Sequence, residues 1–217
     1  LFNSLVAQAQ VAIIQDNDGF TNVRAKADGK AAVIYQLKPN EVFWYDLEEI
    51  HDTNEWVPVT IPLNKFSLEE NLRSTDLKLT GFIHKSRLLP LDKLKPYTAS
   101  DFTFQYTVRK FDVKSHLITY RNENIVALVD GRHPWGTDGN LPLTEVEKIK
   151  VSIGGNIIVI PSVLYGDIFE CDNDFDVYKI GNAFFVHQWN SDGAGAYEVV
   201  WVITNEGVIQ RLVGNMV

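Results

Sequence analysis

One cysteine is the first residue in the chain that could do chemistry. Cys171 is followed sixteen residues later by His187, and cysteine peptidases use a thiolate with a histidine base. Acidic residues flank Cys171 on both sides, and nearby carboxylates raise the pKa of a thiol and disfavour the thiolate. We therefore expect a structural Cys171. Because it is the only cysteine, it also excludes internal disulfides and thiolate metal cages.

Three aspartates in glycine-rich segments of the second half are candidates for acid–base chemistry or calcium binding. Asp130 and Asp138 enclose the sequence GRHPWGT, and Asp192 lies two residues after Asn190 in NSDGAG. Two of these carboxylates, if they converged, could bind Ca²⁺ or act as an acid and a base. The alternative, which we favour, is that they cap hairpin turns by accepting backbone N–H groups. Asp138, Asn190 and Asp192 are also candidate ligand-binding residues.

Other metal and cofactor motifs are missing from the sequence. Residues 172–176 (DNDFD) have the oxygen spacing that begins a calcium loop, but the glycine and the final glutamate of that loop are absent. The five histidines form no i, i+4 pair and no H-E-x-x-H motif. Neither a G-x-S-x-G elbow nor a Walker or dinucleotide glycine motif occurs. We expect no cofactor, no metal and no enzymatic activity.

The elements that must position these residues are mainly β-strands. Residues 102–109 and 148–153 alternate apolar and polar side chains, which places one face in a core and the other in water. Gly154-Gly155-Asn156 predicts a tight hairpin that returns as a buried strand at 157–160. Asn205-Glu206-Gly207 predicts a second hairpin. The fold class predicted is mainly β.

Two domains are predicted, with the boundary near residues 89–100. Pro90 and Pro96 interrupt any strand there, and strict alternation resumes at Phe102. The second domain, residues 98–217, is expected to be small and β-rich, with one short helix that starts at Pro161 and runs to Ile168.

Composition limits the classes of partner. The chain has 217 residues, of which 45% are hydrophobic, so it can bury a core. Its net charge of −8 argues against nucleic acid and anionic bilayers, because both require a basic face. No apolar run approaches the length of a transmembrane segment. The acidity lies in residues 98–217, which carry 9 basic and 15 acidic side chains.

The amino end predicts export. Ala7 and Ala9 fit the small-x-small pattern that signal peptidase recognises, with cleavage before Gln10. Residues 1–9 would then be the remnant of an export signal, and the protein would be periplasmic or extracellular. The alternative is that residues 5–14 are simply the first strand.

Two motifs lie near the ends of the first domain, residues 10–92: Asp18-Gly19 followed by Asn22-Val23-Arg24, and residues 81–88 (GFIHKSRL). They match the opening signature and the closing strand of the bacterial SH3-like (SH3b) family, which the first domain therefore resembles. The resemblance implies a small barrel in which residues 18–24 and 81–88 meet. It also implies an aromatic-lined groove that holds a peptide, a peptidoglycan fragment or a protein partner. An insertion at 58–80 departs from the family pattern.

Aromatic side chains are the candidate ligand contacts. Trp44 and Tyr45 lie in a strand where neighbours point to opposite faces, so one side of Phe43-Trp44-Tyr45 is core and the other is exposed or covered by the insertion. Trp56 and Trp135 are further candidates. Packing is the alternative role for each of them. Arg24 is expected to donate hydrogen bonds to turn carbonyls rather than to contact a ligand.

The second half resembles, around residues 191–201, small C-terminal domains that follow SH3-like modules in Bacteroidetes-type proteins, and this resemblance carries no activity. The sequence therefore predicts a non-catalytic binding protein. Two alternatives stay open. One is a cell-wall hydrolase that uses Asp130, Asp138 or Asp192. The other is an inhibitor or immunity-type protein whose acidic second half binds a basic surface of its partner.

Overall fold

The computed structural model describes residues 11–46, 55–68, 78–190 and 195–214, and its fold is mainly β, as the sequence predicts. The chain forms two compact units. Of the described residues, the first unit contains 11–46, 55–62 and 78–95, and the second contains 63–68, 96–190 and 195–214. None of the helices in the described ranges has the length and apolar character needed to span a lipid bilayer.

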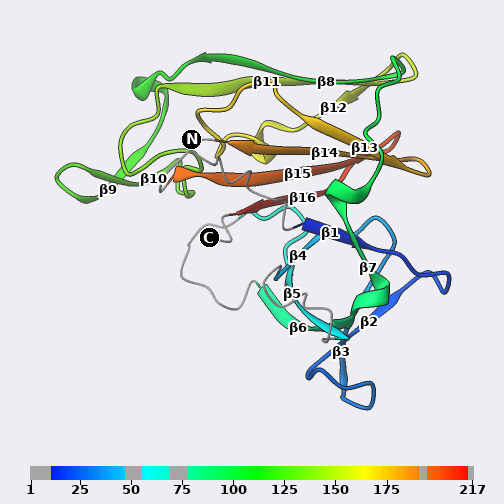
Figure 1. The fold of residues 1–217 in the computed structure, drawn as a ribbon. Coiled ribbons are helices and arrows are strands. Elements are labelled where there is room, and N and C mark those ends of the chain that lie inside the picture. The colour runs from blue at the N-terminus through cyan, green and yellow to red at the C-terminus, as the bar shows by residue number, and fades with distance from the viewer. Residues whose placement is uncertain (1–10, 47–54, 69–77, 191–194, 215–217) are drawn as a thin grey trace, which may run out of the picture. The chain divides into compact units, whose positions relative to one another are not determined.

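One antiparallel sheet of seven strands forms the first unit (Figure 1). It curls around an apolar cluster in which Val23, Phe43, Ile61 and Ile83 are fully buried. The closed barrel that the sequence predicts is not formed, because no pairing within the described residues joins the two edge strands, β3 and β7. In spatial order the strands are β3 (Val33–Leu37), β2 (Thr21–Arg24), β6 (Lys78–His84), β5 (Trp56–Pro62), β4 (Phe43–Tyr45), β1 (Val11–Ile14) and β7 (Leu88–Pro90).

The two stretches that the sequence expects to meet lie next to each other. Arg24 of β2 pairs with Phe82 of β6. The strands approach closely here, since a Cβ added at Gly81 would lie 2.6 Å from a methyl group of Val23. Further along, the N–H of Gln15 donates to the carbonyl of Arg87 at 2.9 Å. The opening and closing segments of the unit are thus joined by strand pairing and by backbone hydrogen bonds.

The extra chain between β5 and β6 is shorter than the predicted insertion at 58–80. β5 continues to Pro62 and β6 begins at Lys78, and the two strands pair from Trp56↔His84 to Pro62↔Lys78. After Pro62, the described residues 63–68 belong to the second unit. Residues 69–77 lie outside the described residues.

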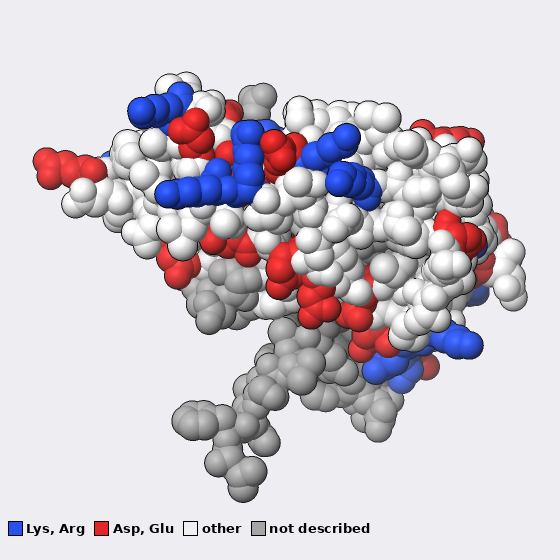
Figure 2. All heavy atoms as spheres, turned by 90° about the horizontal axis from the view of Figure 1, so that it is seen from above, with Lys and Arg blue, Asp and Glu red and all other residues white. Residues whose placement is uncertain are grey.

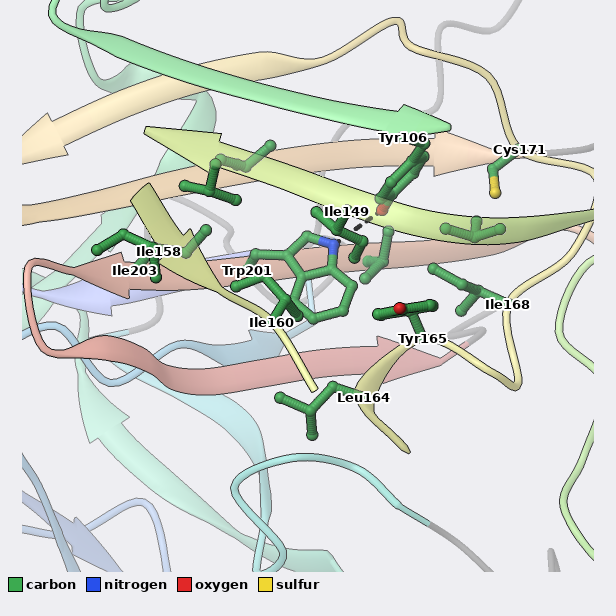
Figure 3. Close-up of a cluster of buried hydrophobic side chains, with 14 of the residues drawn as sticks. Tyr106, Ile149, Ile158, Ile160, Leu164, Tyr165, Ile168, Cys171, Trp201 and Ile203 are labelled. Atoms are coloured by element: carbon green, nitrogen blue, oxygen red, sulfur yellow. Dashed lines mark hydrogen bonds between the residues drawn. The ribbon is translucent and has the colours of Figure 1, made fainter. Parts of the chain in front are cut away.

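Two larger sheets and a separate strand pair form the second unit. The two larger sheets share one apolar core, in which the indole N–H of Trp201 donates to the hydroxyl of Tyr106 at 2.9 Å (Figure 3). One sheet has the order β12 (Asn156–Val159), β11 (Thr144–Ile153), β8 (Phe102–Lys110). The other has the order β13 (Asp176–Ile180), β14 (Ala183–Asn190), β15 (Tyr197–Thr204), β16 (Gly207–Gly214), and the pair is β9 (Ile118–Asn122) with β10 (Ile125–Val129).

Both predicted hairpins are confirmed, but one of their strands is less buried than expected. Gly154 and Gly155 have φ values of +57° and +87° and join β11 to β12, while Asn205-Glu206 joins β15 to β16. The prediction of a buried strand at 157–160 is wrong for two residues, because Ile157 and Val159 are 81% and 80% exposed. β12 is an edge strand with only one covered face, so its side chains alternate between core and solvent.

The predicted helix at 161–168 is reduced to a single 3₁₀ turn, Ser162–Leu164. Tyr165 ends it with φ of −135° and ψ of 0°, which is not helical. The division between the units falls between Lys95 and Pro96, inside the stretch where the sequence predicts a boundary. Pro90 nevertheless belongs to a strand, since β7 is an edge strand and tolerates a missing N–H.

Candidate functional site

A cavity of about 230 Å³ lies in the first unit where β2, the start of β5 and the end of β6 come together. The turn before β2 supplies one wall, and the β5–β6 pair supplies the other. Trp56 is the one sequence-predicted binding residue that lines it. The lining residues are Asp16, Asp18, Phe20, Thr21, Asn22, Arg24, Trp56, His84 and Arg87.

Two rings form the aromatic wall of this cavity. Trp56 and His84 are cross-strand partners on β5 and β6, and their rings meet edge to face with centroids 5.7 Å apart. His84 is held by its neighbour Ser86, whose hydroxyl lies 2.8 Å from Nδ1. Trp56 is only partly buried, so its ring borders both the cavity and solvent. A partly exposed indole fixed by its strand is suited to stacking on a ligand.

A carboxylate held by several donors forms the charged wall. Asp16 accepts hydrogen bonds from the backbone N–H of Asp18 at 3.0 Å, from the guanidinium of Arg87 at 2.6 Å and from the hydroxyl of Thr21 at 2.9 Å. The N–H of Asp18 contributes most to holding the pKa of Asp16 below its usual value. The Asp16 carboxylate is therefore ionised and structurally committed. By contrast, the carboxylate of Asp18 is exposed.

Arg24 has the structural role that the sequence predicts. Its guanidinium donates to the carbonyl of Ala31 at 2.6 Å, across the turn that links β2 to β3. The side chain also lines the cavity. The turn fixes the position of this cation, so Arg24 contributes positive charge to a preformed wall.

Trp44 and Tyr45 do not line the cavity. All three residues of β4 are buried, and Trp44 and Tyr45 are 1% and 2% exposed. The ammonium of Lys78 lies over the Trp44 ring at 5.1 Å from its centroid. Neither face of the Phe43-Trp44-Tyr45 trio is therefore open to solvent. Both candidate residues, Trp44 and Tyr45, have a packing role in this structure.

In the second unit, two candidate residues, Trp135 and Asn190, have structural contacts. Trp135 packs between His133 and Tyr197, at 4.4 and 6.3 Å between ring centroids. Asn190 is buried and donates to Gln188 at 2.8 Å.

Asp138 is exposed and lies beside Gly195, where an added Cβ would stand 2.7 Å from its Oδ1. Asp192 lies outside the described residues. The structure thus places Asp138 next to the end of the segment that contains Asp192, and it places Asp130 elsewhere, against His116.

A charged cluster that the sequence did not indicate surrounds His116. Nδ1 lies 2.7 Å from Asp130 and Nε2 lies 2.8 Å from Glu145, while the ring stacks on Phe111 at 4.7 Å. Arg109 donates to the other oxygen of Glu145 at 3.0 Å. These residues other than Phe111 line a cavity of about 410 Å³. Positions 116, 130 and 145 form no recognisable motif, so only the fold could reveal the cluster.

The charge state of His116 defines what this cluster does. Burial opposes the charged ring, but hydrogen bonds and charges from Asp130 and Glu145 outweigh it and raise the pKa of His116. With both nitrogens donating to carboxylates, the imidazolium has no lone pair and cannot accept a proton. The cluster is an ion-pair clamp between the connection after β8, the end of β10 and the start of β11. Asp130 is occupied there and is not free for the acid–base role considered from the sequence.

Cys171 is unsuited to nucleophilic chemistry, as expected. Burial is the main cause that raises the pKa of the Cys171 thiol to about 12, and the neighbouring carboxylates add to it. His187 contacts Glu198 at 2.8 Å and lies 3.8 Å from Asp176. The histidine is thus paired with carboxylates.

The side chains of the calcium-like stretch 172–176 are engaged within the protein. Asp172 accepts from the N–H of Asp174 at 2.9 Å and from Gln188 at 2.9 Å. Asn173 exchanges two hydrogen bonds with the backbone of Tyr106. In the part of the chain that the structure describes, no three or more His, Cys, Asp or Glu side chains are arranged so that they could hold a metal ion.

Comparison with known proteins finds no relative for this chain. No protein-family model matches it, no curated protein sequence matches it, and no solved structure matches its fold. Function is therefore inferred from the residues of the two units.

Proposed function

We propose that the chain is a non-catalytic binding protein whose first unit is an SH3-like module that holds a short peptide-type ligand at the Trp56 cavity. The observation that carries this proposal is the origin of the lining. Asp18, Asn22 and Arg24 come from the opening SH3b-like motif, and His84 and Arg87 come from the closing one. Five residues of the two motifs that support the family resemblance thus border the cavity.

The chemistry of the walls favours a ligand with amide groups and both charges. Trp56 and His84 offer ring surfaces for stacking, the exposed carboxylate of Asp18 can accept from an amine, and Arg24 can donate to a carboxylate or a carbonyl. A cavity of about 230 Å³ is smaller than a whole drug-sized site, so it would take one or two residues of a longer ligand. A peptide, a peptidoglycan stem peptide or an exposed segment of a protein partner has this character. In this proposal the protein is exported and meets its ligand outside the cytoplasm.

The experiment uses the full chain and soluble peptidoglycan fragments, with a synthetic stem tetrapeptide as a second probe. Trp56→Ala removes the stacking surface, and we expect binding measured by calorimetry to weaken about tenfold or more. Trp189→Ala is the matched control, because Trp189 is a 38% exposed tryptophan of the second unit. We expect the control to bind as the wild type does.

Two outcomes would reject the proposal. Absence of measurable binding of both probes to the wild type is the first. Unchanged binding by a Trp56→Ala variant whose circular dichroism matches the wild type is the second.

A further inference from the structure

The two larger sheets of the second unit have four edge strands, and three of them are covered by other parts of the unit. At β13, Pro96 forms a bridge with Tyr178 and the N–H of Tyr97 donates to the carbonyl of Val177 at 2.7 Å. At β16, the segment containing Lys65 and Ser67 binds the outer side of the strand through Arg211 and Val213. Exposed edges template pairing with other chains, and such covers prevent it.

At the edge of β8, a side chain covers the backbone groups of one residue, Tyr106. Asn173 accepts from the N–H of Tyr106 at 2.7 Å and donates to its carbonyl at 3.1 Å, so its amide stands where a neighbouring strand would be. β12 is the fourth edge, and no segment or side chain of the described residues bonds to its outer side in this way.

The register of the β11–β12 hairpin determines which backbone groups of β12 point outward, away from β11. Ile153 and Asn156 close the two-residue turn, so the backbone groups of Asn156 and Ile158 point to β11 and those of Ile157 and Val159 point outward. These same two residues have side chains that are 81% and 80% exposed. An unpaired edge with two exposed β-branched side chains in alternate positions is what an added strand would use.

A hollow and two lysines adjoin this edge. A cavity of about 880 Å³ is bordered by Ile157, Val159, Lys148, Lys150 and Tyr165. Lys150 stands opposite Val159 in the ladder, and Lys148 lies two residues further along β11, beyond the end of β12. Both lysines are exposed, and neither forms an ion pair within the described residues. Figure 2 views the molecule from above and shows basic side chains with acidic side chains among them, beside an uncharged area.

We infer that β12 is a docking edge for an extended peptide segment of a partner protein, which adds as a fourth strand to the β12–β11–β8 sheet. The added strand would place apolar side chains next to Ile157 and Val159, on the same exposed face of the sheet. An acidic side chain would follow where β12 ends, and it would reach toward Lys148 over the hollow. The partner is thus an acidic segment with alternating apolar residues.

A second copy of this chain fits the edge less well. β12 has the sequence NIIV, so a copy paired through the same strand would bring no acidic residue to the two lysines. A four-residue strand also buries little area, whereas a stable symmetric interface needs about 1,200 Å² or more.

The test uses the full chain and a fluorescent peptide, acetyl-Glu-Thr-Val-Thr-Val-Thr-Glu, in which the glutamates and valines share one face. A second peptide carries lysine in place of both glutamates. We expect saturable binding of the first peptide, measured by anisotropy, and much weaker binding of the second. Val159→Pro removes an outward N–H without touching the β11 ladder, and it should weaken binding about tenfold. Reversing both lysines, Lys148→Glu with Lys150→Glu, should reverse the preference between the peptides.

A control variant and a replacement variant complete the peptide-binding test. Leu143→Lys alters a 74% exposed leucine that is not among the residues bordering the hollow and should bind as the wild type does. If Val159→Pro loses the fold by circular dichroism, Ile157→Glu replaces it, since the added charge repels the glutamate peptide. Three results would overturn the inference: no saturable binding to the wild type, unchanged binding by the folded edge variant, or a concentration-dependent dimer that Val159→Pro abolishes. The Trp56 cavity is not involved in this test.

Discussion

The two units are both antiparallel β, yet they treat buried charge differently. In the first unit, the buried carboxylate of Glu41 is held by neutral donors, the hydroxyl of Tyr35 at 2.6 Å and the N–H of Lys38 at 3.0 Å. In the second, the guanidinium of Arg211 is fully buried and pairs with Asp167 at 2.9 Å.

The two units differ in where the loss of a charged side chain would destabilise them. A buried charge is tolerated only when it is paired and hydrogen-bonded, and removing one partner leaves the other uncompensated. The first unit keeps its cations at the rim, where Arg87 is 42% exposed and borders the cavity. Its stability depends on apolar burial, whereas the second unit also depends on matched charges inside.

The largest expected effect comes from breaking the buried pair. Arg211→Met removes the cation and leaves Asp167 buried without its closest partner, so we expect the second unit to lose about 3–5 kcal/mol of unfolding free energy. Denaturant unfolding followed by amide NMR signals would report each unit separately. Arg87→Met is the matched variant in the first unit, and its effect should be several times smaller because Arg87 is solvated. Equal losses for the two variants would contradict the comparison.

A smaller effect is expected where two strands of the first unit approach most closely. The Cβ of Gly81→Ala would lie 2.6 Å from Val23 and 2.9 Å from the carbonyl of Arg24. Relieving this overlap should cost the first unit about 1–3 kcal/mol and leave the second unchanged. Gly29→Ala is the control, since its Cβ would meet only Trp56 at an ordinary 3.8 Å. A neutral Gly81→Ala would show that the sheet does not depend on this close approach.

The smallest expected effect is the pH dependence of the His116 clamp. Because the folded pKa of His116 is raised, its stabilisation is complete below the unfolded value of about 6.5 and is lost as pH rises through the folded value. His133 acts in the opposite sense, since burial lowers its pKa and its contribution is lost as pH falls. The difference in unfolding free energy between wild type and His116→Gln isolates the clamp, because both proteins contain His133.

We expect that difference to be largest near about pH 5.5 and to shrink toward about pH 9, in the second unit only. Asp130, whose pKa lies below its usual value, stays ionised throughout this range. Denaturant titrations at several pH values would measure it. A difference that does not change with pH would show that His116 is not charged in the folded state.

Local signals in the sequence account for much of the fold. Gly154-Gly155 specified a hairpin because only glycine takes two successive positive φ values without strain, and alternation at 102–109 specified a strand. The burial of Ile157 and Val159 was mispredicted because an apolar residue on a strand does not reveal whether that face is covered. The same limit applies to Trp44, which is buried although strand alternation allowed an exposed face.

The candidate sites were harder to predict, since they are assembled from distant positions. The sequence predicts Trp56 as an aromatic ligand contact of an SH3-like domain. Its cavity also needs Asp16 and His84, which only strand pairing brings near it. His116 and Glu145 are 29 residues apart and meet because β11 returns beside β8. Periodicity reports which faces are apolar, and it carries no information about such long-range pairs.

The segment 63–68 has a consequence for dissecting the protein. It is encoded between two strands of the first unit, yet Lys65 and Ser67 bind the outer side of β16 and Phe66 packs against the core of the second. A fragment cut at Pro96 would therefore lack part of its own second unit. Exchanging that unit for another by recombination would require two separate crossovers in the gene, one of them inside the coding sequence of the first unit.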